Sequence, residues 1–269
     1  MSEQTPKIVV ISGATSGIGQ SCANLFAKHG ATVINISRKE NPEMTFAADY
    51  RGSVADEPRI VAIFDDIRQK YGRVDILINN AGYGLSGATE LITTDEARAI
   101  FETNVMGKFI VAKYALPLMG RGGKLFYISS SMAVHPVPFR ALYGATKAAV
   151  RNMALAQRME LREYGIDVCC VMPGDIKTNF TENRVKDFTT NDRYGDRMKN
   201  AAERLDQKEG KRMSPDVVAR VIYKQSRRKS TRAQVIVGFR HRLLYRLTHG
   251  HSKLYLKMCE KACAPAAKS

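Results

Sequence analysis

The stretch FYISSSMAVHPVPFRALYGATKAAV, residues 126–150, holds side chains that could move a proton. Three serines at 129–131 are followed by Tyr143 and Lys147. Since Tyr143 and Lys147 are four residues apart, they share one face if this segment is helical. A free phenol, with a pKa of about 10, accepts protons poorly at neutral pH, and a neighbouring ammonium group stabilises its phenolate. The pair is suited to general acid–base chemistry, but it is common by chance, so the surrounding elements must decide.

Apolar runs alternate with helical patterns along the chain. We expect strands at 7–12, 32–37, 74–80, 123–130, 166–173 and 233–238, and helices at 19–30, 58–72, 94–119, 143–164 and 215–228. Short strands rich in Val and Ile between helices are typical of a parallel sheet covered on both faces. The sequence therefore predicts an α/β fold with a single doubly wound parallel sheet. Ligands of such sheets lie beyond the carboxyl ends of the strands, where Gly13, Asn80, Ser130 and Pro173 would meet.

A glycine-rich turn, SGATSGIG, follows the first predicted strand with the spacing Gly13-x-x-x-Gly17-x-Gly19. Glycines permit a tight turn and close approach of a phosphate, and the next helix supplies N–H donors at its N-terminus. A turn that binds no ligand is the alternative for such a motif taken alone. Together with NNAG at 79–82, this turn resembles the short-chain dehydrogenase/reductase family, and further landmarks extend the resemblance from residue 8 to about residue 180. It implies a Rossmann fold that binds a nicotinamide dinucleotide.

The resemblance implies that groups at several strand ends hold the cofactor. They are Gly13, Thr15, Ser16, Gly17, Ile18, Gly19, Ser37, Arg38, Asn80, Ala81, Gly82, Tyr143, Lys147, Pro173, Gly174, Ile176 and Thr178. PGDIKT, residues 173–178, resembles the family's loop over the nicotinamide.

Cofactor preference can be predicted from the end of the second strand. Family members that prefer NAD usually carry an acidic residue there, whereas this chain has Ser37 followed by Arg38 and Lys39. Arg38 could pair with a 2′-phosphate and stack on adenine, so we expect NADP(H); the alternative is a solvated basic pair. The family's Asp-Val pair near the adenine falls on Ser53-Val54, so either Ser53 replaces the aspartate or Asp49 serves through a shifted loop.

The resemblance also implies a catalytic set of Asn104, Ser130, Tyr143 and Lys147. Ser130 lies 13 residues before Tyr143, as in the family, although Ser129 and Ser131 leave the register open by one residue. Tyr143 would exchange a proton with the substrate oxygen, and Ser130 would hydrogen-bond to that oxygen. Lys147 would stabilise the phenolate and hold the nicotinamide ribose. Asn104 would keep its helix open for a water that links Lys147 to solvent.

Charge is concentrated at the C-terminal end of the chain. The net charge is +16, and Lys208–Ser269 contributes +13 of it, from 16 Lys and Arg against 3 Asp and Glu. A nearly neutral body argues against a nucleic-acid-binding fold. No apolar run reaches the roughly 18 residues of a membrane span, and MSEQTPK does not resemble a signal peptide. The five cysteines show no disulfide or metal pattern, so we expect a reduced, cytoplasmic protein without a metal site.

The domain organisation is expected to be a dinucleotide-binding and catalytic domain at 1–238, with a substrate lid at about 179–214, and a basic amphipathic extension at 239–269. Such an extension either binds an acidic membrane surface or packs on its own domain or a partner subunit. The family resemblance implies a homodimer or homotetramer formed through the long helices at 95–117 and 143–164.

The substrate is predicted to be a bulky hydrophobic alcohol or ketone, because mostly apolar segments at 83–90 and 132–139 should line the pocket with the lid. Resemblance to family members that act on steroids, retinoids or lipid-like ketones suggests a hydroxysteroid. A 3-oxoacyl thioester on an acidic carrier protein is the alternative, since the basic tail could receive the carrier. A catalytically idle nucleotide-binding protein is a third hypothesis, which the complete catalytic set disfavours.

Overall fold

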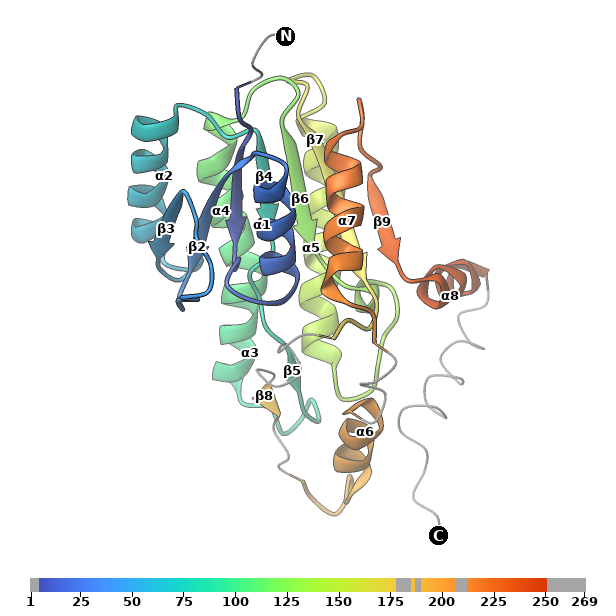
Figure 1. Cartoon of the computed structure of the whole chain (residues 1–269). Coiled ribbons are helices and arrows are strands. Elements are labelled where there is room, and N and C mark those ends of the chain that lie inside the picture. Colours follow the sequence, from blue (N-terminus) through green and yellow to red (C-terminus); the bar gives the residue numbers. More distant parts are fainter. Residues whose placement is uncertain (1–4, 178–184, 187–189, 207–211, 251–269) are drawn as a thin grey trace.

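The computed structural model describes residues 5–177, 185–186, 190–206 and 212–250. Its centre is a seven-stranded sheet in the order β3-β2-β1-β4-β6-β7-β9, in which every neighbouring pair is parallel (Figure 1). The strands are β1 (Ile8–Ser12), β2 (Thr32–Ser37), β3 (Ala48–Arg51), β4 (Ile76–Asn79), β6 (Lys124–Ile128), β7 (Asp167–Pro173) and β9 (Gln234–Val237). The predicted doubly wound α/β fold is confirmed.

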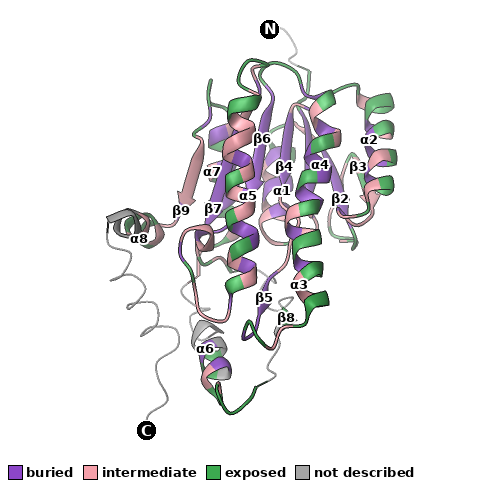
Figure 2. Ribbon diagram, turned by 180° about the vertical axis from the view of Figure 1, so that it is seen from behind, coloured by how far each residue is buried: buried purple, intermediate pink, exposed green. Residues whose placement is uncertain are grey.

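Helices cover both faces of this sheet. One face carries α2 (Glu57–Tyr71), α4 (Gly107–Ala115) and α5 (Ala141–Glu160), which lie in front of the sheet in Figure 2. The other face carries α1 (Gly17–Lys28) and α7 (Pro215–Ser226). Each layer buries its own apolar cluster, and the central strands contribute to both, which explains their continuous apolar runs.

The predicted long helix at 94–119 is interrupted. It consists of α3 (Thr94–Phe101), a π-helical turn η1 (Glu102–Met106), α4, and a 3-10 turn η2 (Leu116–Leu118). Thr93 and Glu96 form a capping box at the start of α3, and Asp95 and Glu96 give its first turn an acidic character. The wide turn falls on Asn104, whose side chain bonds to the backbone of another segment, so tertiary contacts accompany the change of helix type.

One strand of the central sheet and several short elements were not predicted from the sequence. β3, whose sequence ADYR has little apolar character, was not predicted as a strand. β5 (Leu85–Ser86) and β8 (Val185–Lys186) form a small separate sheet. The other short elements are η3 (Ser131–Ala133), α6 (Arg197–Asp206) and α8 (Phe239–Gly250). Part of the predicted lid and most of the predicted extension lie outside the described residues. Within the described ones, no helix is long and apolar enough to cross a bilayer.

A nearly buried ion pair ties the amino end of the last strands together. Lys124 donates to Asp167 over 2.6 Å, and the backbone N–H of Thr231 donates to the same carboxylate over 2.9 Å. Burial alone would raise the pKa of Asp167, but these hydrogen bonds lower it below its usual value. The pair therefore holds β6, β7 and the approach to β9 in register.

We expect Lys124→Met to lower the free energy of unfolding by about 2–3 kcal/mol, because it leaves a desolvated carboxylate with fewer donors. Lys113→Met removes the solvent-screened pair with Glu57 and should lower the free energy of unfolding by much less. Urea denaturation of both variants measures the difference. Equal losses would contradict a special role for the buried pair.

Candidate functional site

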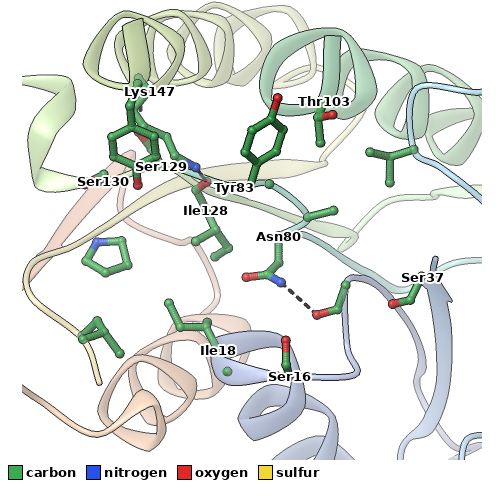
Figure 3. A pocket seen from close by; sticks show the side chains of 18 of the residues that line it. Ser16, Ile18, Ser37, Asn80, Tyr83, Thr103, Ile128, Ser129, Ser130 and Lys147 are labelled. Carbon is green, nitrogen blue, oxygen red and sulfur yellow. Dashed lines mark hydrogen bonds between the residues drawn. The ribbon is translucent and has the colours of Figure 1, made fainter. Parts of the chain in front are cut away.

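A cavity of about 640 Å³ opens at the carboxyl edge of the sheet. The glycine turn, the ends of β2, β4, β6 and β7, and the start of α5 contribute to its wall. In Figure 3, Ser16, Ile18 and Ser37 lie toward one end of it, and Ser129, Ser130 and Lys147 toward the other. Fifteen of the predicted cofactor residues line it: Gly13, Thr15, Ser16, Gly17, Ile18, Ser37, Arg38, Asn80, Ala81, Gly82, Tyr143, Lys147, Pro173, Gly174 and Ile176. Gly19 lies behind the wall, and Thr178 lies outside the described residues.

The glycine turn is compact because side chains would not fit in it. A Cβ on Gly19 would lie 2.0 Å from the carbonyl oxygen of Gly13, which itself has a left-handed φ of 72°. The side chain of Asn80 donates to that carbonyl over 3.1 Å (dashed in Figure 3) and fastens the turn to the end of β4. No side-chain hydrogen bond from Ser16 caps α1, so the first amides of this helix remain available to an anion in the cavity.

A buried amide that the sequence analysis did not single out organises the far end of the cavity. The Oδ1 of Asn35 accepts hydrogen bonds from the backbone of Ala14 and the hydroxyl of Ser37, over 3.0 and 2.8 Å. Its Nδ2 donates to Asp49 over 2.7 Å. The signal was present in the sequence as one amide within the apolar strand TVINIS. Asn35 thereby joins the glycine turn to the ends of β2 and β3.

Asp49 and Ser53, the two residues predicted as alternatives near the adenine of the cofactor, occupy different places. The carboxylate of Asp49 is held by Asn35 and by Arg51, whose guanidinium lies 2.6 Å from it. Ser53, in contrast, lines the cavity, and its neighbour Val54 packs where Gly107 begins α4. Of the two options, the structure places Ser53 at the cavity wall.

The three predicted acid–base residues meet at the opposite end. The Nζ of Lys147 lies 5.4 Å from the centroid of the Tyr143 ring and donates to the carbonyl of Ile128 over 3.4 Å. Both side chains are buried, and Ser130 joins them in the cavity wall. Burial lowers the pKa of Lys147 to about 8. The arrangement places a phenol and a hydroxyl beside an ammonium group that releases its proton readily.

Hydrogen bonds distinguish among the three serines at 129–131 as candidates for the catalytic hydroxyl. The hydroxyl of Ser129 donates to the backbone carbonyl of Lys147 over 2.7 Å and so anchors α5 to the end of β6. The hydroxyl of Ser130 accepts from the backbone of Met132 over 3.2 Å, which leaves its proton available to donate. The third residue, Ser131, is buried at the start of η3. Ser130 therefore remains our choice as the donor to a substrate.

Asn104 lies behind the cavity wall rather than in it. Its side chain accepts from the backbone N–H of Tyr83 and donates to the carbonyl of the same residue, both over 2.9 Å. It also donates to Thr146 on α5 over 3.2 Å. Gly82 passes so close that a Cβ there would lie 2.7 Å from Oδ1 of Asn104 and 3.7 Å from Nζ of Lys147. Asn104 thus fixes the distance between η1, the end of β4 and α5.

A second buried lysine was missed from the sequence. Lys108, one helical turn after Asn104, is fully buried, and its Nζ donates to the carbonyl of Asn79 over 2.7 Å. The amide of Asn79 returns a hydrogen bond to the Lys108 carbonyl over 2.7 Å. Burial, followed by repulsion from Lys147, lowers the pKa of Lys108 well below its usual value. This reciprocal pair fastens α4 to β4 directly beneath the cavity.

The loop after β7 forms the remaining wall. Pro173 ends the strand, and Ile176 makes a parallel bridge to Met213. Among the described residues, no group of His, Cys, Asp and Glu is arranged to hold a metal ion. Arg140 and Arg212, which the sequence analysis did not name, also line the cavity.

Comparison with known proteins places these features in context. Residues 7–188 match the model of the short chain dehydrogenase family. A 3-ketodihydrosphingosine reductase from Bacteroides thetaiotaomicron is 33% identical over 240 residues, covering 87% of this chain and 88% of the relative. A short-chain dehydrogenase structure from Streptomyces avermitilis superposes with a TM-score of 0.83 at 27% identity, covering 96% and 97% of the two chains. Another, from Burkholderia cenocepacia and solved in complex with NADP, shares the fold with a TM-score of 0.72 at 23% identity, covering 86% and 96%.

The lowered pKa of Lys147 predicts a pH-dependent stability. Between pH 8 and 10.5 the unfolded chain retains a proton on Lys147 that the folded protein has released, so stability should rise with pH. Over that interval, the free energy of unfolding of the wild type relative to Lys147→Met should increase by about 3 kcal/mol.

Urea titrations at half-unit pH steps measure this difference, with Lys28→Met, on the exposed end of α1, as the matched control. If the difference in free energy of unfolding between the wild type and Lys147→Met does not change from pH 8 to 10.5, Lys147 keeps its proton in the folded state.

Proposed function

Because the chain belongs to the short-chain dehydrogenase family and is an oxidoreductase of CH–OH groups, we propose that it uses NADP(H) to interconvert a ketone and a secondary alcohol on a hydrophobic substrate. The observation that carries this proposal is the meeting of Ser130, Tyr143 and Lys147 in one cavity with the glycine turn. When bound, the nicotinamide cofactor supplies or accepts the hydride.

The cavity fits such a cofactor in shape and charge. The glycine turn leaves space that side chains would fill, and the open N-terminus of α1 favours a pyrophosphate. In the described part of the chain, five basic side chains and one carboxylate, Asp175, line the cavity. Two of the bases, Arg38 and Lys39, follow Ser37 at the end of β2, where they support recognition of a 2′-phosphate.

The acid–base step rests on this chain's own groups. In reduction, Tyr143 donates its phenolic proton to the substrate oxygen while Ser130 donates a hydrogen bond to the same atom. The ammonium of Lys147 stabilises the phenolate that remains. Asn104 lies in the π-helical turn η1 and hydrogen-bonds to Tyr83, and the family resemblance implies that a water in this widened helix links Lys147 to solvent.

The substrate end is apolar, and we propose a ketone on a long alkyl chain. Tyr83, Met132 and Tyr143 line this end of the cavity, and Leu85 and Ile100, which do not line it, complete a small apolar cluster with them. This wall suits a steroid and an alkyl chain equally. The 3-ketodihydrosphingosine reductase is the relative whose name favours the lipid chain, so we place a 3-keto lipid before the hydroxysteroid expected from the resemblance.

Assembly as a homo-oligomer is also proposed. Large apolar side chains are exposed on η1, α4 and α5, the helices that the resemblance assigns to the subunit contact. They include Met106, Phe109 and Met159. Burying them against a second copy would remove an apolar surface from water.

Contact of α8 with an acidic membrane surface remains a proposal of the same kind. Its exposed side chains combine Phe239 and Leu243 with Arg240 and Arg242. Apolar and basic groups on one exposed surface are the combination that interfacial helices use. A lipid ketone would reach the cavity from such a surface.

We expect Arg38→Ala to raise the KM for NADPH by roughly 10- to 100-fold and to leave the KM for NADH nearly unchanged, because one charge-assisted hydrogen bond to phosphate is lost. Initial rates with each cofactor measure this. Arg98→Ala, on the exposed surface of α3, is the control. An equal effect on both cofactors would remove Arg38 from phosphate recognition.

The function is tested by NADPH oxidation with a 3-keto long-chain base, a steroid ketone and a 3-oxoacyl thioester in parallel. We expect turnover with the long-chain ketone and a loss of at least about 100-fold in kcat for Tyr143→Phe. Tyr114→Phe, on α4, controls for loss of a hydroxyl that donates to Glu57 and does not line the cavity. Turnover confined to the steroid or the thioester would reassign the substrate. Unchanged kcat in Tyr143→Phe would overturn the mechanism, and tight NADPH binding without any turnover would favour an idle binding protein.

A further inference from the structure

The C-terminal helix α8 lies against the loop that the proposed function assigns to the nicotinamide. The backbone N–H of Gly174 donates to the carbonyl of Val237 over 3.0 Å, which continues the pairing of β7 with β9 into the loop. β9 then turns into α8 at Gly238, whose φ is 110°. Figure 1 shows α8 at the carboxyl end of β9. The loop and the helix are therefore neighbours in space although some sixty residues separate them in the chain.

The side chain of His241, in the first turn of α8, occupies the space behind Gly174. A Cβ on Gly174 would lie 2.0 Å from Cδ2 and 2.4 Å from Nε2 of the imidazole. The backbone N–H of Asp175 points to the same Nε2 over 3.4 Å, and the Asp175 carboxylate lies 3.7 Å from it. The ring thus closes the back of the loop whose front lines the cavity.

The backbone of His241 also connects to the substrate side. The Nε2 of His135, a buried residue in the loop between β6 and α5, lies 3.4 Å from the carbonyl of His241. The loops on the two sides of the reacting centre consequently share one support.

Helix α8 is in turn held by hydrogen bonds that lead to β9 and α5. Tyr245, one turn further along α8, accepts a hydrogen bond from Gln234 on β9 over 2.9 Å. Gln234 accepts in turn from Arg151 over 3.0 Å. Arg151 lies one turn after Lys147 on α5. A chain of contacts therefore leads from the catalytic helix to α8 and back to the cofactor loop.

We propose that His241 is a positioning residue that holds the loop Pro173–Lys177 in the conformation that binds the nicotinamide end of the cofactor. The C-terminal helix, which lies outside the segment matched by the family model, thereby sets the affinity for the dinucleotide. This inference rests on the proposed function as a nicotinamide-dependent enzyme.

A double-mutant cycle tests the contact. Gly174→Ala alone places a methyl group in the space that the imidazole of His241 occupies. The loop must then shift, so this variant should raise the Kd for NADPH at least tenfold. His241→Ala alone should raise the Kd several-fold, and should raise the KM for NADPH by more than it lowers kcat. In the double variant the methyl group has room, so we expect a Kd close to that of His241→Ala alone.

NADPH fluorescence titration gives Kd, and initial rates separate KM from kcat. Gly120→Ala, where a Cβ meets nothing within 4 Å, controls for loss of a glycine, and His29→Ala controls for loss of an imidazole. If Gly174→Ala fails to fold, His241→Gln replaces it: an amide that can accept from Asp175 should restore most of the affinity that His241→Ala loses.

Additive effects in the cycle, or wild-type affinity in His241→Ala, would overturn the inference. A wild-type protein that binds neither NADPH nor NADH would instead overturn the proposed function, so the two failures are distinguishable.

Discussion

The ammonium group of Lys147 is the constraint on which the site depends. It is buried beside a phenol, and burial lowers its pKa to about 8. A charge in such a place must be held by fixed dipoles, since water cannot rearrange around it. The carbonyl of Ile128 lies 3.4 Å from it, and the backbone of Gly82 approaches because no side chain intervenes. The ends of β4 and β6 and the helix α5 must therefore meet within a few ångströms.

Polar groups in and behind the cavity wall keep these elements at that separation. Asn104 spans from the end of β4 to α5, Lys108 and Asn79 exchange hydrogen bonds between α4 and β4, and Ser129 holds α5 to β6. Each is buried, so loss of one partner would leave a desolvated polar group. The hydrogen bonds replace ordinary apolar packing here because they fix direction as well as distance. Geometry suited to proton transfer thus depends on groups outside the cavity lining, namely Asn79, Asn104 and Lys108, as well as on Ser129 in the wall.

Apolar runs and the helical spacing of apolar residues predicted most strands and helices of the fold. The strand predicted at 32–37 is β2 (Thr32–Ser37), because a buried parallel strand gives a run dominated by residues such as Val and Ile. β3 was missed because an edge strand of four partly polar residues carries no such pattern. The π-helical turn at Glu102–Met106 was not predicted as a break, because the apolar residues of the predicted helix keep a helical spacing through it. The contact that accompanies the turn, between Asn104 and Tyr83, joins residues far apart in the sequence.

The residues of the sequence motifs were predicted to lie at the cavity, and most of them line it. The residues that support this lining from behind were missed. Glycines and the Ser/Tyr/Lys set lie at the strand ends that alternation predicts, and they line the cavity. Asn35 and Lys108 lie within apolar segments, where a polar residue gives no indication of its partner. His241 follows the last strand, and its contact with Gly174 depends on the path of the chain after β9. Such long-range contacts have no local signal.

The position of β9 has a consequence for synthesis of the chain. This strand pairs with β7, whose residues Cys169–Met172 are fully buried apolar groups with exposed hydrogen-bonding edges until β9 arrives. A ribosome completes the glycine turn, Tyr143 and Lys147 long before it adds Gln234–Val237. The growing chain consequently carries its reactive residues on an open-edged sheet, which is prone to pair with other strands. Closure of that edge and completion of the loop at Gly174 both require Gln234–Val237, because the same strand supplies the partners for each.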